Sequence, residues 1–402
     1  MNYEFLLWIA LILISTKVLG LLCKAVNLPE VVGALLAGVI LGPSALNLMS
    51  MQGDTGTLLG YVAEMGVIFL MFSAGLDTDL KELKANLGAS FITALIGVIV
   101  PLIGGMIGYA LYFGEDLSNY DQMLQSLFVG VVLTATSVSI TVETLREMGR
   151  LSGKVGMTIL GAAIIDDILG MIVLAVVSSM KDTSVKPAAV LIKIVLYFVL
   201  ILVLFLATTH LEFAFSKNDH KRRVAIFAIA FCFILAYVSE VGFGIADITG
   251  AYIAGLIISN VQRSTYLESK FDTLSYLLLS PVFFASIGLK VNLPQMSVSI
   301  IMFAVALTVV AVLTKIVGCG LGAKICGYKN YQAKRIGVGM ISRGEVALIV
   351  ASKGSALGLM SSSILGPVIV VVVITTVITP ILLKVVFAPG TGPSTQIEDA
   401  KK

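Results

Sequence analysis

Residues 161–170 read Gly161-Ala162-Ala163-Ile164-Ile165-Asp166-Asp167-Ile168-Leu169-Gly170, and this pair of carboxylates is the only charge between Val155 and Met180. A carboxylate at the centre of a membrane helix costs about 2.5–3.5 kcal/mol on insertion scales, so two of them need partners or a function. Intramembrane carboxylates usually mark ion or proton pathways. The alternative is a purely structural pair that partners elsewhere in the fold neutralise.

The composition places this pair in a membrane protein. Of 402 residues, 58% are hydrophobic and 13% are charged, whereas a soluble domain carries about 25% charged residues. The net charge of +3 is spread over the loops, so we expect no nucleic-acid partner. The apolar composition predicts a protein of the lipid bilayer. Since the sequence contains no nucleophile, metal-ligand or cofactor motif, we expect neither an enzyme nor a cofactor.

The apolar runs predict an all-α polytopic protein with thirteen transmembrane helices, each near the length that crosses about 30 Å of hydrocarbon. They lie at 4–24, 29–47, 57–77, 87–113, 123–147, 154–180, 186–209, 222–240, 243–261, 274–290, 297–324, 332–355 and 361–387.

Loop charges predict the orientation of these spans, because Lys and Arg accumulate on the cytoplasmic side. With the N-terminus outside, nineteen Lys and Arg fall in cytoplasmic loops and only four fall outside, namely Lys181, Lys186, Lys290 and Lys353. The sequence therefore predicts a multi-pass protein of the cell (inner) membrane with a cytoplasmic C-terminus. Residues 388–402 are predicted to form a disordered cytoplasmic tail, and we expect no soluble regulatory domain after them.

Two short motifs recur in order in the two halves of the chain. Gly33-Ala34-x-x-Ala37-Gly38 matches Gly250-Ala251-x-x-Ala254-Gly255, and Phe72-Ser-Ala-Gly75-Leu76 resembles Phe284-Ala-Ser-Ile-Gly288-Leu289. Small-residue motifs also serve ordinary helix packing, so their ordered recurrence carries the argument. Inverted repeats are a common basis of secondary transporters. We therefore predict two inverted six-helix repeats, joined by the seventh span as a linker helix.

Polar residues interrupt two corresponding spans. One span contains Thr134-Ala135-Thr136-Ser137, and the other contains Ser342-Arg343-Gly344-Glu345. Such paired interruptions indicate crossed discontinuous helices with a binding site near the middle of the membrane. For the first span, hydroxyls that bond to their own helix are an alternative explanation. The charges Arg343 and Glu345 are predicted to support the crossing by offsetting the dipoles of the half-helices.

A third charged position is Lys315, within the predicted span 297–324. It lies about 14 Å from Lys324 at 1.5 Å per residue, which is too deep for easy snorkelling, so it needs an anionic partner. Adjacent helix residues point about 100° apart, so Asp166 and Asp167 cannot face the same target. One carboxylate can pair with Lys315 while the other faces a cavity. Asp167 suits cation binding if it faces the cavity near the two interruptions, where oxygens of Thr136 or Ser137 add hard ligands for transiently bound sodium.

The Asp-Asp pair, the Thr-Ala-Thr-Ser and Ser-Arg-Gly-Glu interruptions and the Thr314-Lys315-x-x-Gly318-Cys-Gly320 stretch resemble the second monovalent cation:proton antiporter family, in particular its bacterial NapA-type sodium/proton antiporters. The resemblance runs from about residue 5 to residue 387. It implies the sodium/proton antiporter fold and a homodimer with an elevator-like mechanism. By similarity, Asp167 is the cation and proton ligand and Asp166 is the partner of Lys315.

The resemblance also implies a division into domains. The predicted dimerisation domain comprises residues 1–86 and, with the linker helix, 182–293; the predicted core transport domain comprises residues 87–181 and 294–387. The expected function is exchange of protons for monovalent cations, sodium or lithium before potassium. The resemblance implies electrogenic exchange, because family members with an Asp-Asp pair are generally electrogenic. A potassium/proton antiporter is the main alternative, followed by a sodium-coupled organic-anion symporter and a cation channel. Holding two spans together is an alternative role for the Asp166 and Lys315 pair.

Overall fold

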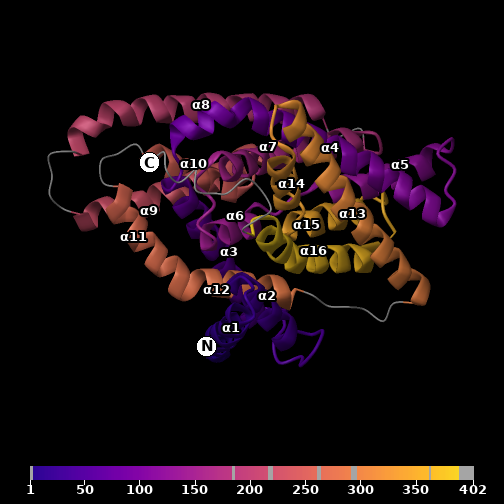
Figure 1. Ribbon diagram of the computed structural model, residues 1–402, viewed down its shortest axis with the longest axis horizontal. Helices are drawn as coiled ribbons and strands as arrows, with labels where there is room; N and C mark the ends of the chain where they lie inside the picture. Colours follow the sequence, from indigo (N-terminus) through magenta and orange to yellow (C-terminus); the bar gives the residue numbers. More distant parts are fainter. Residues whose placement is uncertain are drawn as a thin grey trace. The chain divides into compact units, whose positions relative to one another are not determined.

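A computed structural model describes residues 3–182, 186–215, 221–259, 264–290, 297–361 and 364–388. These residues form helices joined by short connections (Figure 1). The α-helices are α1 (Glu4–Ala25), α2 (Glu30–Leu41), α3 (Gly53–Leu76), α4 (Leu80–Phe113), α5 (Tyr120–Thr134), α6 (Val138–Glu147), α7 (Lys154–Ser179), α8 (Pro187–Phe215), α9 (Lys221–Tyr237), α10 (Asp247–Ser259), α11 (Ser264–Leu274), α12 (Ser280–Leu289), α13 (Val298–Ile325), α14 (Asn330–Gly339), α15 (Glu345–Ala356) and α16 (Leu365–Val386). Two π-helical stretches, η1 (Val238–Phe243) and η2 (Ser275–Leu279), continue α9 and α11.

The described residues contain ten helices that are long and apolar enough to cross a membrane. Three shorter apolar helices accompany them, at Glu30–Leu41, Asp247–Ser259 and Val346–Ala356. The prediction of an all-helical membrane protein is therefore confirmed, whereas the count of thirteen spans stays a prediction. The predicted tail lies outside the described residues, apart from Ala388.

Two helices are shorter than the sequence pattern predicts. The apolar run at 29–47 gives α2, which ends at Leu41 because Gly42 and Pro43 follow it. The run at 243–261 gives α10, which begins only at Asp247. The preceding Gly244 has a φ of 73° and ends η1 in the left-handed conformation, so the helix cannot continue through it. Apolar composition extends beyond the helix in both cases.

The outer surface of α8 explains why these helices need a non-aqueous environment. In its most apolar stretch only 11% of the residues are buried. The side chains of Leu196, Val199, Leu202 and Leu206 are all exposed. A contiguous apolar surface of this kind is costly in water and favourable against lipid.

The chain divides into two compact units. The first comprises Met1–Gly20, Gly33–Lys84 and Met171–Asn292, and the second comprises Leu21–Val32, Ala85–Gly170 and Leu293–Lys402.

Close helix packing in the first unit depends on the glycines of the recurring motifs. A Cβ atom on Gly75 of α3 would collide with the Tyr252 carbonyl of α10, and one on Gly255 would collide with the Phe72 carbonyl. In the same way, Gly38 of α2 lies against the backbone of Ala285 in α12. Both pairs of helices therefore approach to backbone contact, which larger residues would prevent.

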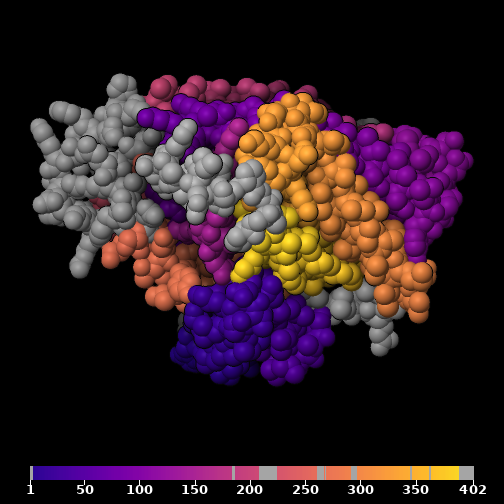
Figure 2. All heavy atoms as spheres, in the orientation of Figure 1, coloured from indigo at the N-terminus to yellow at the C-terminus, as the bar shows by residue number. Residues whose placement is uncertain are grey.

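The second unit contains most of α4 and of α7, together with α5, α6 and α13 to α16. Helices α13 to α16 lie together in Figure 1, and their atoms form one continuous orange and yellow area in Figure 2. Helix α4 packs along α13, because a Cβ atom on Gly322 would come within 2.7 Å of the Thr93 Cα atom. The Tyr112 hydroxyl also donates to the Ser299 carbonyl at 2.7 Å. This packing positions the residues described next.

Candidate functional site

Two helices of the second unit are broken where the sequence predicts polar interruptions. Helix α5 ends at Thr134 and α6 begins at Val138, with extended backbone at Ser137 (φ −90°, ψ 107°). Helix α14 ends at Gly339 and α15 begins at Glu345. Each break leaves backbone groups without partners inside its own helix, so these groups need other partners or a ligand.

The two breaks bond directly to each other. The Ser137 amide donates to the Ser342 carbonyl at 2.8 Å, and the Ser342 hydroxyl donates to the Ser137 carbonyl at 2.8 Å. The approach is close enough that a Cβ atom on Gly344 would lie 2.9 Å from the Ser137 side chain. A side chain at position 344 would therefore collide with Ser137 unless the two breaks moved apart.

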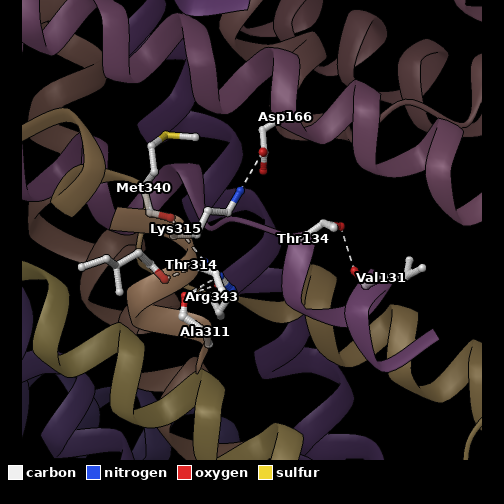
Figure 3. A network of polar contacts seen from close by, with 9 residues as sticks. Val131, Thr134, Asp166, Ala311, Thr314, Lys315, Met340 and Arg343 are labelled. Carbon is white, nitrogen blue, oxygen red and sulfur yellow. Dashed lines mark hydrogen bonds and ion pairs between the residues drawn. The ribbon is translucent and has the colours of Figure 1, made fainter. Parts of the chain in front are cut away.

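An ion pair joins α7 to α13. The Lys315 ammonium donates to Asp166 Oδ1 at 2.7 Å, and both side chains are completely buried (Figure 3). The resemblance to the antiporter family implies the same pairing. The pair is neutral as a whole, which reduces the cost of both charges in this apolar setting. Its role in exchange stays a prediction.

Asp167 differs from its neighbour. The residue is only 9% exposed, and neither oxygen of its carboxylate has a hydrogen-bond partner among the described residues. Asp167 lies one turn before Gly170, on the same face of α7. That face approaches the end of α5, since a Cβ atom on Gly170 would lie 4.0 Å from Thr134 Oγ1. Buried polar groups are normally satisfied, so these two oxygens are candidates to bind a cation or a proton.

The break between α5 and α6 adds further oxygen atoms. The hydroxyl of Thr136 is buried, on a residue 2% exposed, and has no hydrogen-bond partner among the described residues. The Ser137 hydroxyl lies 3.4 Å from the Ser139 hydroxyl. Hydroxyl and carboxylate oxygens are hard ligands that suit small cations.

Arg343 supports the second break from within. Its guanidinium donates to the carbonyls of Ile341 at 2.7 Å, Ala311 at 3.2 Å and Met340 at 3.3 Å (Figure 3). A positive charge just beyond the last turn of α14 offsets the negative end of the helix dipole. The side chain of Glu345, the other predicted supporting residue, lies outside the described residues.

Four hydroxyl residues to which the sequence pattern assigns no role also bond at the breaks. On α16, Thr375 Oγ1 accepts from the Arg343 amide at 3.2 Å and Thr376 Oγ1 donates to the Arg343 carbonyl at 2.7 Å. Thr141 and Ser342 connect the breaks. The signal in the sequence is weak, because Ser and Thr in helices commonly bond to their own backbone.

Comparison with known proteins identifies the family. The profile of the family described as sodium/hydrogen exchanger, transmembrane, matches residues 10–388. The chain is 40% identical over 389 residues to the Na(+)/H(+)-K(+) antiporter GerN of Bacillus cereus, covering 96% of this chain and 97% of the relative. It is 34% identical to a Na(+)/H(+) antiporter of Enterococcus hirae, covering 95% and 97%.

A solved structure supports the fold. The sodium proton antiporter MjNhaP1 of Methanocaldococcus jannaschii superposes with a TM-score of 0.69 at 16% identity, and the match covers 98% of this chain and 100% of that structure. At this identity the likeness concerns the fold alone. Together with the family match, these findings exclude an enzyme and show a multi-pass transporter. The chain belongs to the sodium/hydrogen exchanger family and is a monovalent cation/proton antiporter of the membrane.

Proposed function

We propose that the protein exchanges protons for sodium or lithium, with Asp167 as the group that binds either ion. The observation that carries this proposal is the pair of unpartnered oxygens on the buried Asp167, next to an Asp166 that is already paired. A buried lone carboxylate is unfavourable unless it binds a cation or a proton. Because both ligands use the same oxygens, they exclude each other.

Thr136 is the proposed second ligand. Its unpartnered hydroxyl lies in the α5–α6 break, and the face of α7 that carries Asp167 approaches the end of α5. In this proposal Ser137 positions the break through its bonds to Ser342, and Arg343 holds the opposite break. Glu345 retains its predicted supporting role.

Potassium is the second candidate cation. The Bacillus cereus relative is named for sodium, potassium and proton exchange, so we include potassium as a possible substrate of this protein. A channel is less favoured because the polar groups gather at the two breaks. For a sodium-coupled organic-anion symporter we would expect a second sodium site, and none of the described contacts supports one.

We further propose the domain and assembly scheme of the NapA-type antiporters within the second cation:proton antiporter family. Residues 1–86 and 182–293 then form the dimerisation domain of a homodimer, and residues 87–181 and 294–387 form a core that moves as an elevator. The two compact units support this division because their segments alternate along the chain in nearly the same way. The paired glycine contacts support the inverted repeats, since α2 packs on α12 as α10 packs on α3. The N-terminus is proposed to lie outside.

Proton flux in proteoliposomes tests the proposed function. We expect added sodium or lithium to drive proton movement that saturates with cation concentration, with potassium as the third arm of the series. A clamped membrane potential should change the rate, because an electrogenic exchange moves net charge. Flux that does not depend on the proton gradient, or that fails to saturate, would contradict antiport.

A further inference from the structure

A network of hydroxyl groups connects the two breaks behind the proposed ligands. Thr141 Oγ1 of α6 donates to the carbonyl of Gly339, the last residue of α14, at 2.8 Å. Thr141 Oγ1 also lies 3.0 Å from the Ser342 hydroxyl, which in turn lies 2.8 Å from the Ser137 carbonyl. Thr141, Ser342 and Ser137 are all buried. The network therefore binds a helix that follows one break to the helix that precedes the other.

The network has no spare donor. The hydroxyls of Thr141 and Ser342 each carry a single proton. They make three contacts within hydrogen-bonding distance, namely with the Gly339 carbonyl, with the Ser137 carbonyl and with each other. When both protons go to the carbonyls of Gly339 and Ser137, no proton remains for the contact between Thr141 and Ser342. Removal of either hydroxyl therefore leaves a contact at one break without its donor, and neither hydroxyl can replace the other.

Helix α14 transmits this constraint to the helices of the ion pair. A Cβ atom on Gly337 would come within 2.6 Å of the Ile316 carbonyl of α13, next to Lys315. A Cβ atom on Gly339 would come within 2.7 Å of the Ile159 side chain of α7. The end of α14 that Thr141 holds thus packs against both helices that carry the buried charges. A shift of the break cannot be absorbed locally, because the interior is close-packed.

We propose that Thr141 and Ser342 are positioning residues that fix the spacing of the two breaks and thereby favour small cations over potassium. This inference rests on the proposed function. Discrimination between cations depends on the size, number and flexibility of the surrounding oxygens. A rigid break holds oxygen ligands at the shorter distances that sodium and lithium need. A loosened break lets the ligands move apart and accommodate a larger ion.

Thr141→Val tests this proposal, because valine keeps the branched shape and removes only the hydroxyl. We expect the apparent KM for sodium to rise about fivefold, the effect of one net hydrogen bond. The apparent KM for potassium should change less, so the two values move closer together. If the wild type transports no potassium, measurable potassium flux in Thr141→Val would support the proposal in the same way. The maximal rate should stay within about twofold, since the proposed ligands remain in place.

Thr144→Val is the matched control. Thr144 lies on the same helix and is equally buried, but its hydroxyl bonds to the Ile140 carbonyl of its own helix at 2.7 Å. We expect its KM values to match those of the wild type. Thr141→Ser keeps the hydroxyl, so we expect it to keep the sodium preference of the wild type. If Thr141→Val does not fold, Ser342→Ala serves as the test variant, and we expect the same change in KM values from it.

The outcomes separate this inference from the proposed function. If the ratio of the sodium KM to the potassium KM in Thr141→Val and Ser342→Ala equals that of the wild type, the positioning role is overturned while antiport stays intact. Equal loss of maximal rate for both cations, with unchanged KM values, would also overturn it, because that pattern belongs to a purely structural role. Absence of cation-dependent proton flux in the wild type would instead contradict the proposed function.

Discussion

We expect Asp167→Asn to reduce cation-dependent proton flux to the level of protein-free liposomes. The physical reason is that an amide keeps the shape of the carboxylate but can neither carry the negative charge that binds a cation nor take up a transported proton. Both oxygens of Asp167 are buried without partners among the described residues, and the neighbouring Asp166 is already paired with Lys315, so we expect no other carboxylate to replace the lost charge. The measurement is proton flux in proteoliposomes loaded with sodium.

Asp54→Asn is the control for this variant. Asp54 lies exposed in the first turn of α3, so its replacement removes one carboxylate from the chain without touching the buried site. We expect wild-type flux from it. Full exchange by Asp167→Asn, measured beside this control, would rule out Asp167 as the shared ligand.

Methionine at position 315 should destabilise the folded protein by about 3–5 kcal/mol, because Asp166 then stays buried with no cationic partner. Both side chains of the pair are completely buried in the structure, so water cannot replace the lost partner. The measurement is thermal unfolding of the purified protein in detergent. A second substitution, Asp166→Leu, should recover much of this stability, since the double variant contains no uncompensated charge.

Lys193→Met controls for the loss of a lysine as such. Lys193 is exposed on α8, so we expect a change within about 0.5 kcal/mol. If Lys315→Met unfolds at the same temperature as Lys193→Met, the ion pair contributes nothing to stability. Failure of Asp166→Leu to rescue Lys315→Met would show that the loss comes from packing and not from an unpaired charge.

The sequence predicts the charged part of the site well because the cost of burying charge is large. Lys315 is too deep to snorkel, and only one of two adjacent carboxylates can face it, so the sequence predicts one Asp–Lys pair, and the resemblance to the antiporter family assigns that pair to Asp166. The structure places these two groups 2.7 Å apart. The helix breaks were predicted for a similar reason, since an Arg-Gly-Glu sequence in an apolar run is costly in a continuous helix.

The hydroxyl contacts could not be predicted in the same way. Thr141 and Thr144 look alike in the sequence, yet one bonds across to α14 and the other bonds to its own helix. Each such bond contributes only about 1 kcal/mol, and the choice depends on which distant backbone lies nearby. The apolar pattern also did not predict that α2 ends at Leu41, because hydrophobic residues continue past Gly42 and Pro43 while the helix does not.

Competition between sodium and protons at Asp167 is the central claim, and binding measured as a function of pH tests it most directly. Purified protein is titrated with sodium at a series of pH values, and the apparent affinity is compared between the wild type and Asp167→Asn. Protonation of Asp167 removes the charge that holds the cation, so affinity should fall as pH falls, approaching about tenfold per pH unit. Asp167→Asn should bind weakly at every pH. Sodium affinity that is independent of pH in the wild type would contradict the account.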